Sequence, residues 1–300
     1  MNQSYFGVGS LWNLLIIFYF VKTNLKKGLK KMSSYHFLII VLAVVDFSVV
    51  VSSLPISFKQ PSETFLFCVL DTFSSEVGPM TACWILVLIS YDRYRSIAYP
   101  LKSRMSKRKY GLFCVVICIL ACAVNTYLYL NMKSVDLPDG RRLLCFIVNF
   151  YQIYRIQLFA NFLVDSLVPI TTMGYLYRKM CRRMLQEQTE NSFTLSHQSR
   201  LRNRRALRTI RSLIVLFSIS VFGMRILYIF NFIMHADPDQ TTEYYFYIVP
   251  RILLTILQPL VILVFRSNNL LNIFIYAKMI PGFRRFLLAV FTCGMYGRSV

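Results

Sequence analysis

The chain has 300 residues, of which 56% are hydrophobic, and its formal net charge is +21. A mean hydropathy of +0.52 is too high for an ordinary soluble domain, so we expect the membrane to be its solvent. The positive charge does not indicate a nucleic-acid-binding protein, because the lysines and arginines lie in loops between apolar segments rather than on a soluble fold.

Seven apolar runs are expected to cross the membrane as helices. They cover residues 6–22, 34–58, 66–91, 110–131, 156–178, 209–235 and 245–277. Basic residues gather after the first, third, fifth and seventh runs, whereas the charges in the alternate loops nearly cancel. By the positive-inside rule, the N-terminus is therefore outside the cell and the C-terminus is cytosolic. The sequence predicts an all-α membrane protein whose residues 1–300 form a single seven-helix domain.

The first run begins close to the start of the chain. Asn2 opens the sequon Asn2-Gln3-Ser4, which is a glycosylation candidate if it reaches the lumen beyond the bilayer. In the second run, Asp46 is a deep carboxylate that is costly without a partner or an ion.

The third run is followed directly by Asp92-Arg93-Tyr94, where a membrane helix is expected to meet the cytosol. Because Asp92 and Arg93 are adjacent, the carboxylate can hold the guanidinium at the helix end, and Arg93 can later be released to another partner. The alternative is that both are ordinary solvated charges at the membrane interface. The full pattern consists of Asp92, Arg93, Tyr94, Ile97, Pro100 and Leu101.

The spacing of these residues resembles the end of the third helix in the rhodopsin-like (class A) G protein-coupled receptors, and the chain is identified as a divergent member. The resemblance implies a plasma-membrane receptor that activates heterotrimeric G proteins when an extracellular ligand binds. Arrestin and a receptor kinase are further implied partners, together with membrane lipid. We expect no enzymatic activity, no cofactor other than a candidate sodium ion, and no nucleic-acid partner.

A disulfide bond is implied by the same resemblance. Cys68 lies 25 residues before Arg93, where the family places the cysteine at the top of its third helix. Cys68 and Cys145 are also the cysteines on the outer, oxidising side of the expected topology, so we expect them to pair. The turn residues 137–141 predict a β-hairpin carrying Cys145 in the second extracellular loop, and a plain coil held by the disulfide is the alternative.

Asn13 stands where the family carries its first-helix asparagine, and few residues precede it. A full membrane span needs about 20, so the resemblance implies that the first helix is truncated at its outer end.

The carboxylate of Asp46 matches the acid that the family uses to bind sodium and to couple its helices. Asn268 and Asn272 in the seventh run are the candidate co-ligands. The family's third-helix serine is Ala82 here, so the sequence leaves open whether sodium binds.

The family's activation residues are present only in part. Pro169 in the fifth run and Phe217 in the sixth run match the family. The sixth-helix tryptophan is replaced by Val221, and the kinking proline is replaced by Gly223, which permits a bend more weakly than proline imposes one. The resemblance implies that Cys83, Pro169, Phe217 and Val221 form a relay between a ligand cavity and the cytosol.

At the inner end, the resemblance implies that Arg93 leaves Asp92 on activation. It then stacks toward Tyr177 and Tyr276 and meets the G protein. The residues implied in this switch and in coupling are Asp92, Arg93, Tyr94, Leu101, Tyr177, Asn272 and Tyr276. The segment 201–205 at the base of the sixth run contains no acid to restrain Arg93, so we expect a weakly locked inactive state and raised basal signalling.

The segment 281–286 resembles the family's short amphipathic eighth helix. Such a helix is expected to lie on the inner leaflet of the membrane. Cys293 beyond it is a palmitoylation candidate, and an unmodified thiol is the alternative.

Ionisable residues inside the apolar runs are candidates for ligand binding, because each is costly in a membrane without a partner. The two arginines among them suit a ligand carboxylate, so a peptide or a small acidic molecule is favoured over an amine. The amine reading is also disfavoured because Ser75 replaces the required aspartate. The pocket candidates are Ser75, Glu76, Asn161, Asp165, Arg225, Gln258 and Arg266. The alternative is that the acids and arginines neutralise one another across the bundle.

Other functions stay open at this point. Within the family, a chemosensory or odorant-type receptor or an amine receptor is an alternative. From another class, a membrane transporter or channel would use the intramembrane charges as a pathway, but the expected inverted repeats are not seen. A membrane enzyme would need a nucleophile and a base, and the sequence shows no such constellation.

Overall fold

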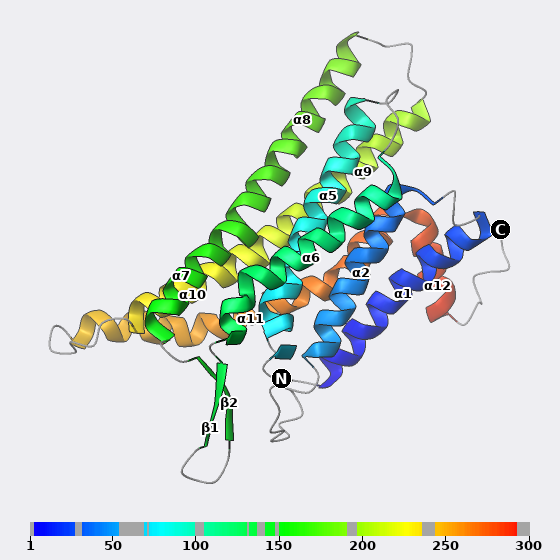
Figure 1. Cartoon of the computed structure of the whole chain (residues 1–300). Helices are drawn as coiled ribbons and strands as arrows, with labels where there is room; N and C mark the ends of the chain where they lie inside the picture. Colours follow the sequence, from blue (N-terminus) through cyan, green and yellow to red (C-terminus); the bar gives the residue numbers. More distant parts are fainter. Residues whose placement is uncertain are drawn as a thin grey trace.

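The computed structural model describes residues 3–27, 32–53, 69–70, 72–99, 105–130, 132–136, 142–147, 150–190, 197–235 and 244–292. Helices dominate these residues and run side by side as an elongated bundle (Figure 1). The helices are α1 Gln3–Lys27, α2 Ser34–Ser52, α5 Gly78–Ala98, α6 Lys107–Leu130, α7 Phe150–Asn161, α8 Val168–Glu190, α9 His197–Phe217, α10 Gly223–His235, α11 Tyr244–Met279 and α12 Pro281–Phe291.

Successive helical segments join end to end into longer rods. Short π-helical segments lie within three of these rods. They are η2 Phe73–Val77 before α5, η3 Phe162–Leu167 between α7 and α8, and η4 Ser218–Phe222 between α9 and α10. A π-helical turn has one extra residue per hydrogen-bonded loop and is frequent at functional sites. The residues that flank all three segments keep helical dihedrals, so each rod continues through its segment.

Among the described residues, six helical stretches are long and apolar enough to cross a membrane. They are Gly7–Leu25, Ser34–Ser52, Phe73–Ala98, Lys107–Thr126, Ile156–Gln186 and Asn203–Phe230. The seventh predicted run falls within α11, which contains the shorter apolar stretch Thr255–Phe265. The prediction of an all-helical membrane architecture is confirmed, since each predicted run overlaps one of these rods.

The two ends of the bundle differ. A two-stranded antiparallel pair, β1 Met132–Asp136 and β2 Arg142–Ile147, projects from one end, which also holds the start of α1 (Figure 1). We call this the hairpin end. The helix α12 lies toward the opposite end, here the α12 end, where α8 and α9 extend beyond their neighbours (Figure 1). The position of the strand pair in an extracellular loop stays a prediction.

The helix α12 begins where Ile280 leaves the helical conformation and Pro281 opens a new helix. Proline is well tolerated at this position, because its missing N–H would have no intrahelical partner. Phe283 is fully buried and packs against Tyr19 of α1, with ring centroids 5.1 Å apart. The helix is therefore anchored to α1, and its location on an inner leaflet stays a prediction.

A close approach of α2 to the start of α5 depends on a glycine. A Cβ added at Gly78 would overlap the Cγ2 atom of Val49. Valine is stiff at χ1, so this side chain cannot easily turn away. Only glycine therefore allows the two helices to approach this closely at the level of η2.

Candidate functional site

The polar groups of the predicted switch meet at the C-terminal end of α5. The guanidinium of Arg93 donates to Asp92 Oδ2 across 2.9 Å. The other carboxylate oxygen, Oδ1, accepts a hydrogen bond of 3.1 Å from the hydroxyl of Tyr110 on α6. The side chain of Asp92 is only 7% exposed, so these two donors satisfy a carboxylate that is shielded from water.

Arg93 also contacts an aromatic ring that the sequence did not single out. Its Cζ atom lies 3.9 Å from the ring centroid of Tyr35 in the first turn of α2. A guanidinium stacked on a ring gains about 0.5–2 kcal/mol, with the larger value where water is excluded. The Nε atom of Arg93 is buried and has no hydrogen-bond partner among the described residues. The ring therefore supports a cation that is only partly satisfied by hydrogen bonds.

The other predicted switch residues occupy separate positions. Tyr94 and Tyr177 pack beside an apolar cluster that joins α5, α8 and α9, formed by Ile97, Met180 and Ile210. Tyr276 is fully buried in α11, and its hydroxyl has no hydrogen-bond partner among the described residues. The described contacts of the Arg93 side chain are with Asp92 and Tyr35, so this conformation is not the one in which Arg93 stacks toward Tyr177 and Tyr276.

Two of the three residues of the predicted sodium site are joined by a hydrogen bond. Asn272 on α11 donates to Asp46 Oδ2 on α2 across 2.7 Å, and both side chains are buried. Asn268 is buried one helical turn before Asn272. The buried Ala82 has no side-chain oxygen to offer as a ligand, and sodium binding at Asp46 stays a prediction.

The predicted relay residues lie in the middle of the bundle. Cys83, Phe217 and Val221 are all buried in one apolar core cluster that also contains Tyr276. Pro169 is buried near the start of α8. The structure thus brings three of the four relay residues into one packed unit, although their role in activation stays a prediction.

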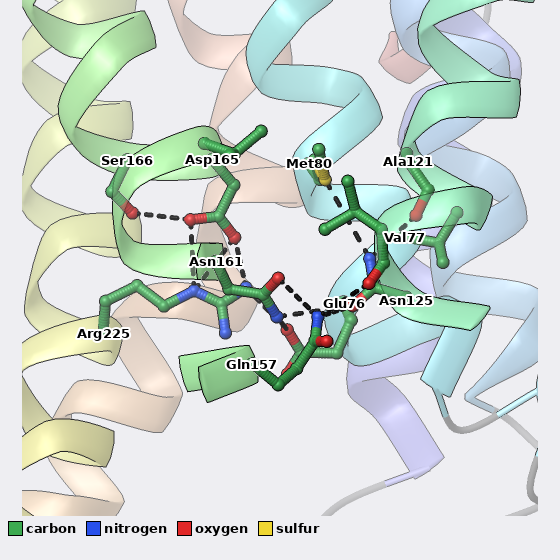
Figure 2. A network of polar contacts seen from close by, with 12 residues as sticks. Glu76, Val77, Met80, Ala121, Asn125, Gln157, Asn161, Asp165, Ser166 and Arg225 are labelled. Atoms are coloured by element: carbon green, nitrogen blue, oxygen red, sulfur yellow. Dashed lines mark hydrogen bonds and ion pairs between the residues drawn. The ribbon is translucent and has the colours of Figure 1, made fainter. Parts of the chain in front are cut away.

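A second polar site joins three of the intramembrane charges (Figure 2). Arg225 on α10 donates from Nη2 to Glu76 Oε2 across 2.7 Å. Its Nε donates to both oxygens of Asp165, at 2.9 and 3.3 Å, and Nη2 also contacts Asp165 Oδ2. We call Glu76, Asp165 and Arg225 the charge cluster. Within it, the arginine is neutralised by the two acids, which was the alternative interpretation of these charges.

The charge cluster coincides with the irregular parts of the helices. Glu76 lies within η2, Asp165 lies within η3, and Arg225 follows η4 by three residues. Within η3, the carbonyl of Val164 accepts a hydrogen bond of 3.0 Å from the indole of Trp84. The extra residue of a π-helical turn shifts the side chains that follow, and here it brings charges from three rods to one point.

Amide side chains extend this site toward α6. Asn161 Nδ2 donates to Glu76 Oε2 across 2.9 Å, and Gln157 Nε2 donates to Asn161 Oδ1 across 2.8 Å (Figure 2). Gln157 also donates to Asn125 Oδ1 on α6 across 3.2 Å. Asn161 was predicted, whereas Gln157 and Asn125 were missed. Their signal was present, because both are amides inside apolar runs, where an unpaired polar group is costly.

The described hydrogen bonds of this network do not include the remaining pocket candidates. Ser75 is half-buried in η2, and Gln258 is exposed on α11. Arg266 belongs to α11, but its side chain lies outside the described residues. The preference for an acidic ligand depended on two available arginines, and Arg225 is already engaged by two carboxylates. The geometry therefore weakens that preference.

Several predicted positions lie outside the described residues. They are Asn2, Cys68, Leu101, Cys293 and the side chain of Cys145. The disulfide, the glycosylation and palmitoylation sites and the contact of Leu101 with a G protein accordingly stay predictions.

Comparison with known proteins identifies the family. Residues 12–261 match the family described as 7 transmembrane receptor (rhodopsin family). The chain therefore belongs to the rhodopsin family of seven-transmembrane receptors, as the residues around Arg93 predicted. Membership of a family of multi-pass membrane receptors argues against the transporter, channel and enzyme alternatives.

Individual relatives are distant. The chain is similar to the tachykinin-like peptides receptor 86C of Drosophila melanogaster, with 25% identity over 193 residues, which is 60% of this chain and 37% of the relative. It is 28% identical to the human olfactory receptor 2A5 over 134 residues, 41% of this chain and 42% of the relative. It is 24% identical to neuropeptide receptor 18 of Caenorhabditis elegans over 172 residues, 50% of this chain and 35% of the relative. The chain spans less than half the length of these relatives.

Proposed function

We propose that this protein is a plasma-membrane receptor that transmits the binding of an extracellular ligand to a heterotrimeric G protein. The observation that carries the proposal is the state of Arg93 at the α12 end, where it is held by Asp92 and Tyr35 and keeps one buried N–H without a partner among the described residues. A cation held this way can be transferred to a new partner without leaving a tightly satisfied site.

The packing around Arg93 supports a switch between two states. Ile210 of α9 packs with Ile97 of α5 and Met180 of α8 in the apolar cluster beside Tyr94 and Tyr177. Apolar contacts can be exchanged as one helix moves against its neighbours, and a partner that binds the open arrangement shifts the population toward it. An outward movement of α9 would open a path to Arg93 for the G protein.

The charge cluster is the proposed contact for an extracellular ligand. Glu76 has 14% of its side chain exposed, whereas Arg225 has 4% and Asp165 has 1%. A ligand entering from the hairpin end would therefore meet the carboxylate of Glu76 first, and a basic group suits it. We propose a peptide ligand, since two of the relatives are named as peptide receptors.

The proposed orientation places the hairpin end outside the cell and the α12 end in the cytosol. The distribution of basic residues after alternate helices supports this orientation. On α12, Leu288 and Phe291 are exposed together with Arg284 and Arg285, a combination that suits the inner leaflet. Arrestin and a receptor kinase are proposed as further partners at the same end.

The proposal is tested in cells that express the full chain with a promiscuous G protein reporter. A library of synthetic neuropeptides serves as the probe, and amines and carboxylic acids are screened beside it. We expect a peptide response that Arg93→Ala reduces to the level of vector-only cells at matched surface expression. Arg108→Ala removes an exposed arginine from α6 and is expected to leave the response intact. An unchanged response in Arg93→Ala would contradict the proposal.

A further inference from the structure

The base of α9 offers no carboxylate to restrain Arg93. Residues 201–205 at the start of α9 contain no acid, so the restraint on Arg93 has to come from elsewhere in the fold. Among the described residues, the contacts of its guanidinium are with Asp92 on the same helix and with the ring of Tyr35 on α2. Tyr35 is therefore the described contact that joins this guanidinium to a different helix.

The ring of Tyr35 stands on a fixed stretch of backbone. Ser33 caps the helix by accepting from the backbone N–H of His36 across 3.2 Å. The hydroxyl of Ser34 donates to the carbonyl of Met105, before α6, across 3.2 Å. A capped first turn loses little further freedom when its side chain meets a partner. The backbone that carries Tyr35 is thus fixed independently of the guanidinium that stacks on its ring.

A second tyrosine holds the other half of the pair. The hydroxyl of Tyr110 on α6 donates to Asp92 Oδ1, while Arg93 uses Oδ2. The charged pair of α5 is therefore held from α2 through its cation and from α6 through its anion. Freeing Arg93 requires that its ring contact with Tyr35 be lost, whereas the hydrogen bond from Tyr110 to Asp92 can remain.

We propose that Tyr35 and Arg93 form an aromatic latch, in which stacking of the guanidinium on the ring keeps Arg93 from the G protein and sets the ligand-independent activity of the receptor. The proposal rests on the proposed function and adds its regulation. Tyr35 is a positioning residue in this account, because it acts through Arg93.

The test uses the full chain in nanodiscs with no ligand added. The measured quantity is the rate of guanine nucleotide exchange on a panel of purified heterotrimeric G proteins, expressed per folded receptor. Tyr35→Leu removes the ring and keeps an apolar side chain, and we expect it to raise the rate about three- to tenfold. Tyr35→Phe keeps the ring and is expected to stay within about twofold of the unmodified receptor.

The comparison of the two variants separates a latch from a purely structural role. A structural role would lower the amount of folded receptor without raising the exchange rate per folded molecule. The latch is overturned if Tyr35→Leu leaves that rate unchanged or lower, or if Tyr35→Phe is as active as Tyr35→Leu. Tyr35→Met also removes the ring, and it takes the place of Tyr35→Leu if that variant does not fold. The same rise in the exchange rate is expected for it.

Arg93→Ala distinguishes failure of the latch from failure of the proposed function. If Arg93→Ala abolishes exchange and Tyr35→Leu does not raise it, the latch is wrong and the proposed function stands. If Arg93→Ala leaves exchange unchanged, the proposed function fails and the latch fails with it. If the latch is correct, adding Tyr35→Leu to Arg93→Ala restores no exchange.

Discussion

Asn272 on α11 donates a hydrogen bond of 2.7 Å to the carboxylate of Asp46 on α2, although 226 residues separate them in the chain. Both side chains are buried in the bundle. The hydrogen bond is therefore a polar tie between α2 and α11 inside the bundle.

An exchange of these two residues tests the tie. Asn272→Asp places two carboxylates against each other in a buried position, and we expect it to destabilise the receptor by about 3 kcal/mol. Adding Asp46→Asn restores one carboxylate and one amide and should recover most of the loss. Thermal denaturation of the purified receptor in detergent measures the stability of the single and the double variant. A double variant that is no more stable than Asn272→Asp would show that the two side chains are not coupled.

The charge cluster predicts a larger effect. Arg225→Met leaves Glu76 and Asp165 buried and facing each other, so we expect a loss of about 3–5 kcal/mol and a marked drop in surface expression. Neutralising both acids with Glu76→Gln and Asp165→Asn in the same background should restore part of the folded population. Arg208→Met, on an exposed arginine of α9, is the control. Equal expression of Arg225→Met and the control would rule out the cluster as a stabilising unit.

The close approach of α2 and α5 predicts a steric effect. Gly78→Ala forces a methyl group against Val49, and overpacking of this kind costs about 1–3 kcal/mol. Val49→Ala in the same chain makes room for the methyl group and should recover stability. Gly174→Ala is the matched control, because no atom lies within 4 Å of a Cβ added there. The melting temperature of each purified variant measures the effect. Equal melting temperatures for Gly78→Ala and Gly174→Ala would contradict the close approach of α2 and α5 at Gly78.

The order of the helices and the family were predictable from the sequence, because both depend on short-range patterns. Apolar runs of membrane length mark the helices, and the spacing from Asp92 to Leu101 marks the family. The contact of Arg93 with Tyr35 was not predictable in this way. It joins α5 to α2 and depends on how the rods pack.

The charge cluster was also predictable only in part. The cost of ions in a membrane was enough to identify Glu76, Asp165 and Arg225 as candidates. Their mutual pairing was one of two interpretations, since the sequence contains no sign of the π-helical segments that bring them together. Gln157 was missed although it lies four residues before Asn161, on the same side of the helix.

The central claim is that Arg93 becomes a contact of the G protein. The most direct measurement is the affinity of the full receptor in nanodiscs for purified, nucleotide-free heterotrimeric G protein, determined by surface plasmon resonance. The account predicts that Arg93→Ala weakens this affinity at least about tenfold, the effect of losing one charge-assisted hydrogen-bonded contact, while Arg108→Ala stays within about twofold of the unmodified receptor. Equal affinities for the unmodified receptor and Arg93→Ala would contradict it.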